Sequence, residues 1–184
     1  EAKLPRFEKE ILAFEKWDHQ NAVPQNGVLF VGSSTVRLWQ TATDFPGLPV
    51  INRGFGGSTI ADANRFAERI VIKYKPAVIV FYSGDNDIAS GKSPQKVFEN
   101  FLMFFKLVRE KLPETRIVVL SVKPSVARWK KWPQAQEVNA LLQRLAKEDD
   151  HLTYIDISPP MLGPDGHRLL LEESIVAIKG GAAP

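Results

Sequence analysis

Three short segments of the sequence carry hydroxyl, amide and backbone groups that suit acyl transfer, and each of them follows an apolar run. The first segment is Gly32-Ser33-Ser34-Thr35. A serine where a strand turns into a helix presents its hydroxyl to a crevice, and the backbone amide there points toward a developing oxyanion. Serine is also a common helix N-cap, and the Gly-x-Ser-x-Gly spacing of a nucleophile elbow is absent. Taken alone, the segment favours a cap and leaves a nucleophile open.

The second segment, Asn52 to Thr59, contains three glycines after a short apolar run. A phosphate-binding loop would need a lysine before Ser58, which follows Gly57 directly. A dinucleotide fingerprint would need glycine or alanine in place of Thr59 and an acid about twenty residues later, where Lys73 and Lys75 stand. The glycines therefore indicate either close approach of the backbone to a ligand or plain turn geometry.

The third segment is Ser83-Gly84-Asp85-Asn86-Asp87. The Asn86 amide can donate a hydrogen bond to an oxyanion without titrating, although an asparagine in a loop more often holds a turn. The two aspartates suggest a cation site, but one short loop supplies too few ligands for one. Of the three histidines, we expect His19 and His151 at the surface. His167 follows the last strand, on the correct side of the sheet for a general base, but Asp165-Gly166 is a strong turn signal, so a turn histidine is the default interpretation.

The elements that must position these segments alternate between strand-length apolar runs and amphipathic stretches, which is typical of a doubly wound parallel sheet. The expected strands are Val28 to Gly32, Val50 to Asn52, Ala77 to Tyr82, Ile117 to Val122 and Leu152 to Ile157. The expected helices are Phe7 to Asp18, Ile60 to Lys73, Gln95 to Lys111 and Gln134 to Lys147. We predict one flavodoxin-like, three-layer α/β/α domain over residues 1–184 with a five-stranded parallel sheet. In the common strand order 2-1-3-4-5, all three segments meet at one crevice.

Composition narrows the function classes. The 184 residues carry 24 basic and 21 acidic side chains, a net charge of +3 that is too small and too evenly spread for a nucleic-acid partner. We expect the one basic cluster, Arg128 to Trp132, to be a solvated loop, and Trp129 and Trp132 within it to form either a lid or an exposed contact such as a homodimer interface. No cysteine is present, and no apolar run is long enough to span a membrane. Cytoplasmic and secreted or periplasmic locations both stay open, because the first residue is Glu1.

Taken together, the three segments resemble the SGNH, or GDSL-like, hydrolases, in particular the branch of small lipase/acylhydrolase-type esterases. The family's Gly-Asp-Ser block is matched by Gly32-Ser33-Ser34, its second block by Asn52 to Thr59, and its Gly-x-Asn-Asp block by Gly84-Asp85-Asn86-Asp87. The resemblance extends from about Phe7 to Leu162. It implies that Ser34 is the nucleophile, that the Ser34 amide, the Gly57 amide and the Asn86 side chain form an oxyanion hole, and that neither a metal nor an organic cofactor is needed.

The family's last block, Asp-x-x-His, supplies the general base and its orienting acid, and here the match departs. The chain has Asp165-Gly166-His167, one residue short, and Met161 to Gly166 resembles a hairpin that precedes the block in relatives. That alignment places the block near Glu173 and beyond, where there is no histidine. Two interpretations stay open: either His167 and Asp165 have taken over as base and orienter in a rearranged terminus, or the base has been lost by truncation or divergence, which the alignment favours.

These observations predict a serine esterase that cleaves small-molecule carboxylic esters through an acyl-enzyme on Ser34. The alternative is a binding protein that lacks a base and keeps a pocket for an acyl group or an acetylated sugar. A nucleotide-binding protein is disfavoured because both phosphate motifs fail. Short acyl esters, acetylated carbohydrates, thioesters and lysophospholipids all stay open as substrates.

Overall fold

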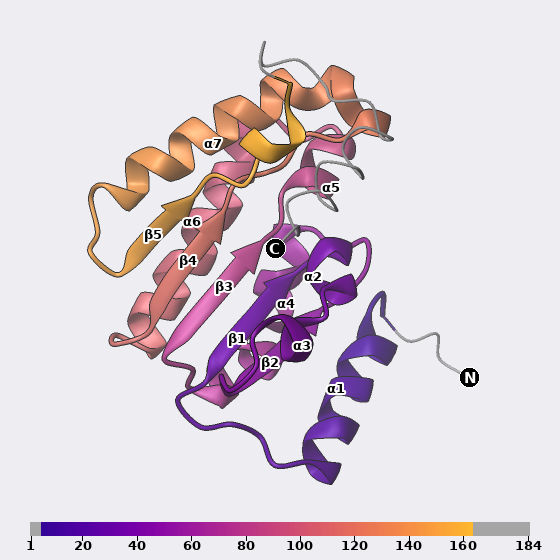
Figure 1. Cartoon of the computed structure of the whole chain (residues 1–184), viewed down its shortest axis with the longest axis vertical. Helices are drawn as coiled ribbons and strands as arrows, with labels where there is room; N and C mark the ends of the chain where they lie inside the picture. Colours follow the sequence, from indigo (N-terminus) through magenta and orange to yellow (C-terminus); the bar gives the residue numbers. More distant parts are fainter. Residues whose placement is uncertain (1–4, 164–184) are drawn as a thin grey trace, which may run out of the picture.

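The computed structural model describes residues 5–163, and its centre is a five-stranded parallel sheet in the order β2-β1-β3-β4-β5 (Figure 1). The fold class and strand order predicted from the sequence are confirmed. The strands are β1 (Val28–Gly32), β2 (Val50–Gly54), β3 (Val78–Tyr82), β4 (Arg116–Leu120) and β5 (Leu152–Ile155). The helices are α1 (Glu8–Gln20), α2 (Ser34–Leu38), α3 (Thr41–Asp44), α4 (Ile60–Ile70), α5 (Asp85–Ala89), α6 (Pro94–Lys111) and α7 (Trp132–Ala146), with 3-10 helices η1 (Ile72–Tyr74), η2 (Val126–Lys131) and η3 (Pro159–Met161).

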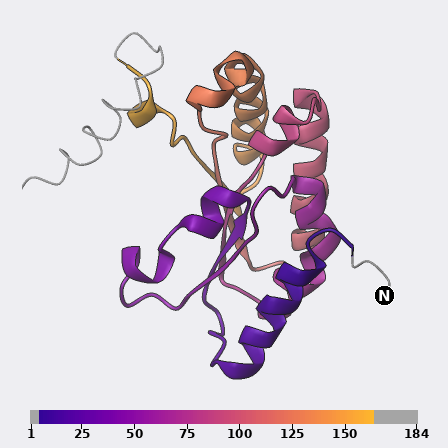
Figure 2. The same cartoon turned by 90° about the vertical axis from the view of Figure 1, so that its right-hand side faces the viewer.

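Helices cover both faces of the sheet, as Figure 2 shows from the side: α2 and α3 lie on one face, and α4 and α6 lie on the other. The helix α7 packs beside α6, and α1 packs on α4. The larger part of the core lies under α4, α6 and α7, where Ile79, Phe81 and Val119 of the sheet are buried. A smaller cluster under α2 contains Phe30 and Tyr82. Burial on both faces explains why the strands are continuous apolar runs rather than alternating ones.

Side-chain hydrogen bonds set the strand ends where they differ from the prediction. The strand β4 ends at Leu120 rather than Val122, because the backbone N–H and C=O of Val122 both bond to the Asn139 side chain, at 2.8 and 3.0 Å. The strand β5 ends at Ile155 rather than Ile157, whose N–H donates to Ser121 Oγ at 2.9 Å. At the carboxyl edge of the sheet, the backbone after each of these strands therefore bonds to side chains instead of to a neighbouring strand.

A buried ion pair joins α1 to the sheet. The Arg53 side chain in β2 is only 5% exposed, and it pairs with Asp18 at the end of α1. Its Nε donates to the hydroxyl of Tyr74 at 2.6 Å, and that hydroxyl donates to Asp18 at 2.7 Å. Lys73 is a second cation on the same carboxylate. A buried charge is costly without a partner, and this network supplies the partners of Arg53. The strand β2 can therefore continue past Asn52, its predicted end, through Arg53 to Gly54.

The tryptophan pair differs from the prediction. Trp132 opens α7 and is 8% exposed, packed into the core, and the half-buried Trp129 stacks on it at 6.4 Å between ring centroids. The prediction that both rings form an exposed contact or lid is therefore wrong for Trp132. This ring lies on the same buried face of α7 as Ala135 and Val138, and it packs into the core with them. Within residues 5–163, no helix is long and apolar enough to cross a membrane.

Candidate functional site

The three segments that the sequence singles out meet at the carboxyl edge of the sheet. The strand β1 lies between β2 and β3, with Gly32 in register with Gly54 on one side and Tyr82 on the other. The Phe55 amide donates to the Gly32 carbonyl at 3.0 Å, which joins the first segment to the second. Parallel strands that end at the same edge bring their following loops together at the crevice of such folds. The prediction that all three segments converge is therefore borne out by their contacts.

Ser34 begins α2 directly after β1 and is half-buried. The preceding Ser33 occupies the N-cap position, but its side chain makes no capping bond. It is fully buried and its Oγ donates to Asp85 Oδ1 at 3.4 Å. The two serines thus differ in burial. Ser33 is buried and bonded to the third segment, whereas Ser34 is partly exposed at the crevice.

Two glycines shape the backbone around Ser34. A Cβ on Gly32 would lie 1.9 Å from the Tyr82 carbonyl oxygen, so only glycine lets β1 approach β3 this closely. Gly57 has a φ of +77°, the left-handed region that glycine adopts without strain. Among the residues that the structure describes, neither the Ser34 nor the Gly57 amide donates a hydrogen bond. Both N–H groups can therefore donate a hydrogen bond to an oxyanion.

The Asn86 side-chain amide has a fixed orientation. Its Nδ2 donates to the Ser58 carbonyl at 2.9 Å, and its Oδ1 accepts from an Arg128 guanidinium nitrogen at 3.0 Å. A carbonyl can only accept a hydrogen bond and a guanidinium can only donate one. These two partners therefore fix which end of the Asn86 amide carries the nitrogen and which carries the oxygen. One Nδ2 hydrogen remains for a ligand. Asn86 therefore joins the second segment to the third, which is more than the turn-holding role that its sequence context favours.

Arg128 is a residue of the site that the sequence analysis missed. It lies in η2, in the basic stretch expected to be a solvated loop, yet its guanidinium contacts Asn86 and forms an ion pair with Asp85 Oδ2 at 3.3 Å. Its side chain is 39% exposed. The available signal was its place after β4, whose carboxyl end faces the same crevice. A residue in the loop after an inner strand is expected at the same edge of the sheet as the other strand-end residues.

The aspartates that suggested a cation site have other partners. Asp87 is fully buried, where it accepts from the Ile60 amide at 3.0 Å and pairs with Lys92 at 2.8 Å. Asp85 is occupied by Ser33 and Arg128. Asp87 thus ties α5 to the start of α4, and Asp85 ties it to η2, so both carboxylates position the segment around Asn86.

Tyr82 places a second polar group beside the nucleophile candidate. Its hydroxyl is buried next to the Thr35 side chain and the Lys123 backbone. Burial, reinforced by the charge of Asp85, raises the pKa of the Tyr82 hydroxyl well above its usual range. The phenol is therefore neutral at physiological pH.

The base and orienter candidates, His167 and Asp165, lie outside the described residues. The other two histidines are where the sequence predicts them: His19 is exposed at the end of α1, and His151 precedes β5 at the amino edge of the sheet, 3.7 Å from Asp149. Neither is near Ser34 in the sheet's layout. Within residues 5–163, the site thus contains the Ser34 hydroxyl and N–H groups that can donate hydrogen bonds, and no histidine.

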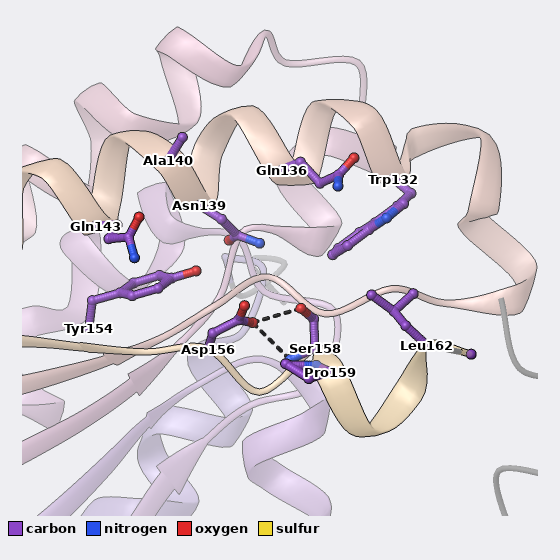
Figure 3. A pocket seen from close by; sticks show the side chains of 11 residues that line it. Trp132, Gln136, Asn139, Ala140, Gln143, Tyr154, Asp156, Ser158, Pro159 and Leu162 are labelled. Carbon is purple, nitrogen blue, oxygen red and sulfur yellow. Dashed lines mark hydrogen bonds between the residues drawn. The ribbon is translucent and has the colours of Figure 1, made fainter. Parts of the chain in front are cut away.

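A separate groove of about 510 Å³ opens between α7 and the end of β5 (Figure 3). Trp132, Gln136 and Gln143 line it from α7, opposite Tyr154 and Asp156. Burial works to raise the pKa of Asp156, but hydrogen bonds from Ser158 and Ser121 outweigh it and hold that pKa below its ordinary value. The strand β5 is three strands from β1, about 14 Å across the sheet, so this groove does not include Ser34.

Solved structures share this architecture. One is a protein from Streptococcus pneumoniae provisionally described as a platelet activating factor, with a TM-score of 0.76 and 18% identity over 94% of this chain and 89% of that chain. A GDSL-like lipase from Bacteroides thetaiotaomicron has a TM-score of 0.67 and 19% identity over 92% and 93% of the two chains. A carbohydrate esterase of family 3 from Talaromyces cellulolyticus has a TM-score of 0.56 and 15% identity, over 84% and 93%. At these identities the likeness establishes the fold.

The sequence itself identifies the family. No curated protein matches the chain. The model of the GDSL-like lipase/acylhydrolase family, however, matches residues 30–173, which include all three strand-end segments and most of the chain. That match confirms the resemblance found in the sequence and supports ester hydrolysis as the general activity. The chain therefore belongs to the GDSL-like lipase/acylhydrolase family.

Proposed function

We propose that the protein is a serine esterase that hydrolyses small carboxylic esters through an acyl-enzyme on Ser34. The observation that carries the proposal is the convergence of Ser34, the Gly57 amide and the fixed Asn86 amide at the ends of three neighbouring strands. Three neutral donors around one hydroxyl suit a tetrahedral oxyanion, whose charge develops only in the transition state. The family's activity supports this function over that of a ligand-binding relative.

The reaction has two halves. In the first, Ser34 Oγ attacks the ester carbonyl and gives its proton to a base, while the oxyanion accepts hydrogen bonds from the Ser34 and Gly57 amides and from Asn86 Nδ2. Collapse of the intermediate breaks the ester C–O bond, and the alcohol leaves with the proton that the base returns. In the second half, water attacks the acyl-enzyme by the same route and releases the acid. For the base we propose His167, oriented by Asp165.

The nucleophile is tested by trapping the acyl group. The protein is mixed with p-nitrophenyl acetate, quenched in acid and digested, and the acetylated peptide is located by mass spectrometry. We expect acetyl on Ser34 in the unmodified protein and in Ser33→Ala, and none in Ser34→Ala. Ser33→Ala is the matched control because it removes the adjacent hydroxyl. Acetyl on another residue, or release of p-nitrophenol by Ser34→Ala at the full rate, contradicts the assignment.

The base is tested by comparing the unmodified protein with His167→Ala in one assay at equal concentrations. If His167 is the base, turnover falls by about 10³-fold or more, as for other triad members. It also falls as the pH drops through about 6.5, the ordinary pKa of histidine. Equal turnover by both proteins excludes His167, and negligible turnover by both contradicts the proposed esterase function.

A further inference from the structure

Three arginine side chains lie against the second and third segments, at or next to residues that we assign to the oxyanion hole. Arg128 bonds to Asn86, as described above. Arg6, just before α1, donates from Nη2 to the Gly57 carbonyl at 3.1 Å. Arg37, in α2, lies against Gly56, where a Cβ would come within 2.9 Å of Arg37 Nε. Although these arginines come from distant parts of the sequence, Arg6 and Arg37 meet at the Gly56–Gly57 turn, and Arg128 lies at Asn86, which is bonded to the next residue of that turn, Ser58.

Most of this positive charge has no acidic partner in the described part of the chain. Only Arg128 forms an ion pair, with Asp85. Arg6 and Arg37 are exposed and form none within residues 5–163. The only other aspartate of the third segment, Asp87, is buried and already paired with a lysine. Asp62 accepts hydrogen bonds from the Thr59 amide and hydroxyl. Within residues 5–163, the exposed charges of Arg6 and Arg37 at the second segment are therefore not neutralised by a contact with any carboxylate.

We infer that the site prefers esters that carry a negatively charged group, such as a carboxylate, close to the scissile bond; this inference rests on the proposed function. A guanidinium presents a rigid fork of N–H donors that matches the geometry of a carboxylate or phosphate. Exposed cations also raise the local concentration of anionic substrates at the mouth of a cleft. Arg6 and Arg37 suit both effects, because both side chains are exposed at the Gly56–Gly57 turn, where Arg6 is bonded to the Gly57 carbonyl and Arg37 lies against Gly56.

Paired esters test the preference and show which side of the ester carries the charge. For the alcohol side, the pair is 4-acetoxybenzoate and phenyl acetate. For the acyl side, the pair is mono-p-nitrophenyl fumarate and p-nitrophenyl crotonate, because the trans double bond keeps the fumarate carboxylate from attacking its own ester. Each kcat/KM is divided by the rate of hydroxide-catalysed hydrolysis, so that intrinsic reactivity cancels. We expect the anionic member of at least one pair to be preferred by about tenfold at low salt, and the preference to shrink in 0.5 M NaCl as charges are screened.

Arginine variants locate the preference. In Arg37→Gln and Arg6→Gln, we expect the ratio of anionic to neutral kcat/KM to fall by about threefold each, as for single exposed charges within a Debye length. The control is Arg116→Gln, which removes an exposed arginine at the opposite edge of the sheet, where β4 begins, and should keep the ratio. Equal ratios in the unmodified protein and both variants, or an equal loss in Arg116→Gln, overturn the inference.

A binding measurement separates this inference from the proposed function. Ser34→Ala protein is titrated with 4-acetoxybenzoate and with phenyl acetate, and binding is followed by ligand NMR. If no ester is turned over but the anionic ester binds more tightly, and Arg37→Gln in the same background removes the difference, the esterase function fails while the charge preference holds. If esters are turned over without discrimination and bind equally, the charge preference is wrong and the esterase function stands.

Discussion

Arg128 should act on catalysis through Asn86, and Arg128→Ala tests this. The substitution removes the charge-assisted hydrogen bond to Asn86 Oδ1, leaving the amide held only by the Ser58 carbonyl. A hydrogen bond to a charged group contributes about 1.5 to 3 kcal/mol when buried. Because the Arg128 side chain is 39% exposed, water replaces part of it, and about 1 kcal/mol is a better value. That corresponds to roughly a fivefold loss of turnover.

A second effect adds to the first. Without Arg128, the charge of Asp85 is no longer compensated by its ion pair at 3.3 Å, and a carboxylate near the crevice opposes a developing oxyanion. We therefore expect Arg128→Ala to lower kcat by about tenfold in all, well below the 10²- to 10³-fold that removal of an oxyanion donor costs. KM should change by less than about twofold, because the uncharged ester gains this interaction only in the transition state.

The assay is a double-mutant cycle with p-nitrophenyl acetate. If Arg128 acts by orienting Asn86, then Arg128→Ala should lower kcat by only about twofold in the Asn86→Ala protein, where no amide remains to be oriented. Arg128→Lys should recover part of the loss, because an ammonium keeps the charge but cannot bridge Asp85 and Asn86 as a guanidinium does. The same tenfold loss in both backgrounds would refute the reasoning, provided that the thermal midpoints show all variants folded.

Three further outcomes are expected. Asn86→Ala should lower kcat by about 10²- to 10³-fold and should lower the thermal midpoint slightly, because its bonds with Ser58 and Arg128 are lost; a loss of kcat below tenfold would make the residue purely structural. Gly57→Ala should cost about 1 kcal/mol in urea unfolding, because its φ is +77°, and it should lower kcat further by moving the amide; unaltered kinetics would exclude that amide from the hole. Asp18→Asn should lower the free energy of unfolding by about 2 kcal/mol, because Arg53 loses its buried partner. Burial raises the pKa of Asp18, but hydrogen bonds from Lys73, Tyr74 and Arg53 outweigh burial and lower that pKa. The stabilisation is therefore complete above the ordinary pKa of 3.8 and is lost as the pH falls below it. An acid titration of the free energy of unfolding should show this loss in the unmodified protein and not in Asp18→Asn.

The sheet was predictable from the sequence because its strands are long enough, and buried enough, to leave continuous apolar runs. The bounds of β1 agree with the prediction at both ends. The short helices α2 and α5 were not predicted, since five residues are too few for helical periodicity to be visible. They are held by one buried apolar residue each, Val36 and Ile88, and by the tertiary contacts of the crevice.

The site was predictable only in its strand-end residues. Ser34, Gly57 and Asn86 are recognisable because each follows a strand and its type suits an oxyanion or a nucleophile. The position of Arg128 after β4 indicates only that it lies near the carboxyl edge of the sheet. Its contact with Asn86, 42 positions away, could not be predicted because it depends on the path of η2. The partners of Asp85 and Asp87 were hidden for the same reason: a pair of acids in one loop suggests a cation, and only the fold reveals the arginine and lysine that neutralise them.

The helix α1 precedes the part of the chain that the family model matches, which begins at residue 30, and yet it holds the Gly57 turn from two directions. At its end, Asp18 pairs with Arg53, four residues before Gly57 on the same strand and turn. At its start, Arg6 bonds to the Gly57 carbonyl, and the Phe7 ring packs edge-on against Phe55 at 5.1 Å. A protein trimmed to residues 30–173 would keep Ser34, Gly57 and Asn86, but it would lose Asp18, Arg6 and Phe7 and, with them, the contacts that hold the Gly57 turn in place.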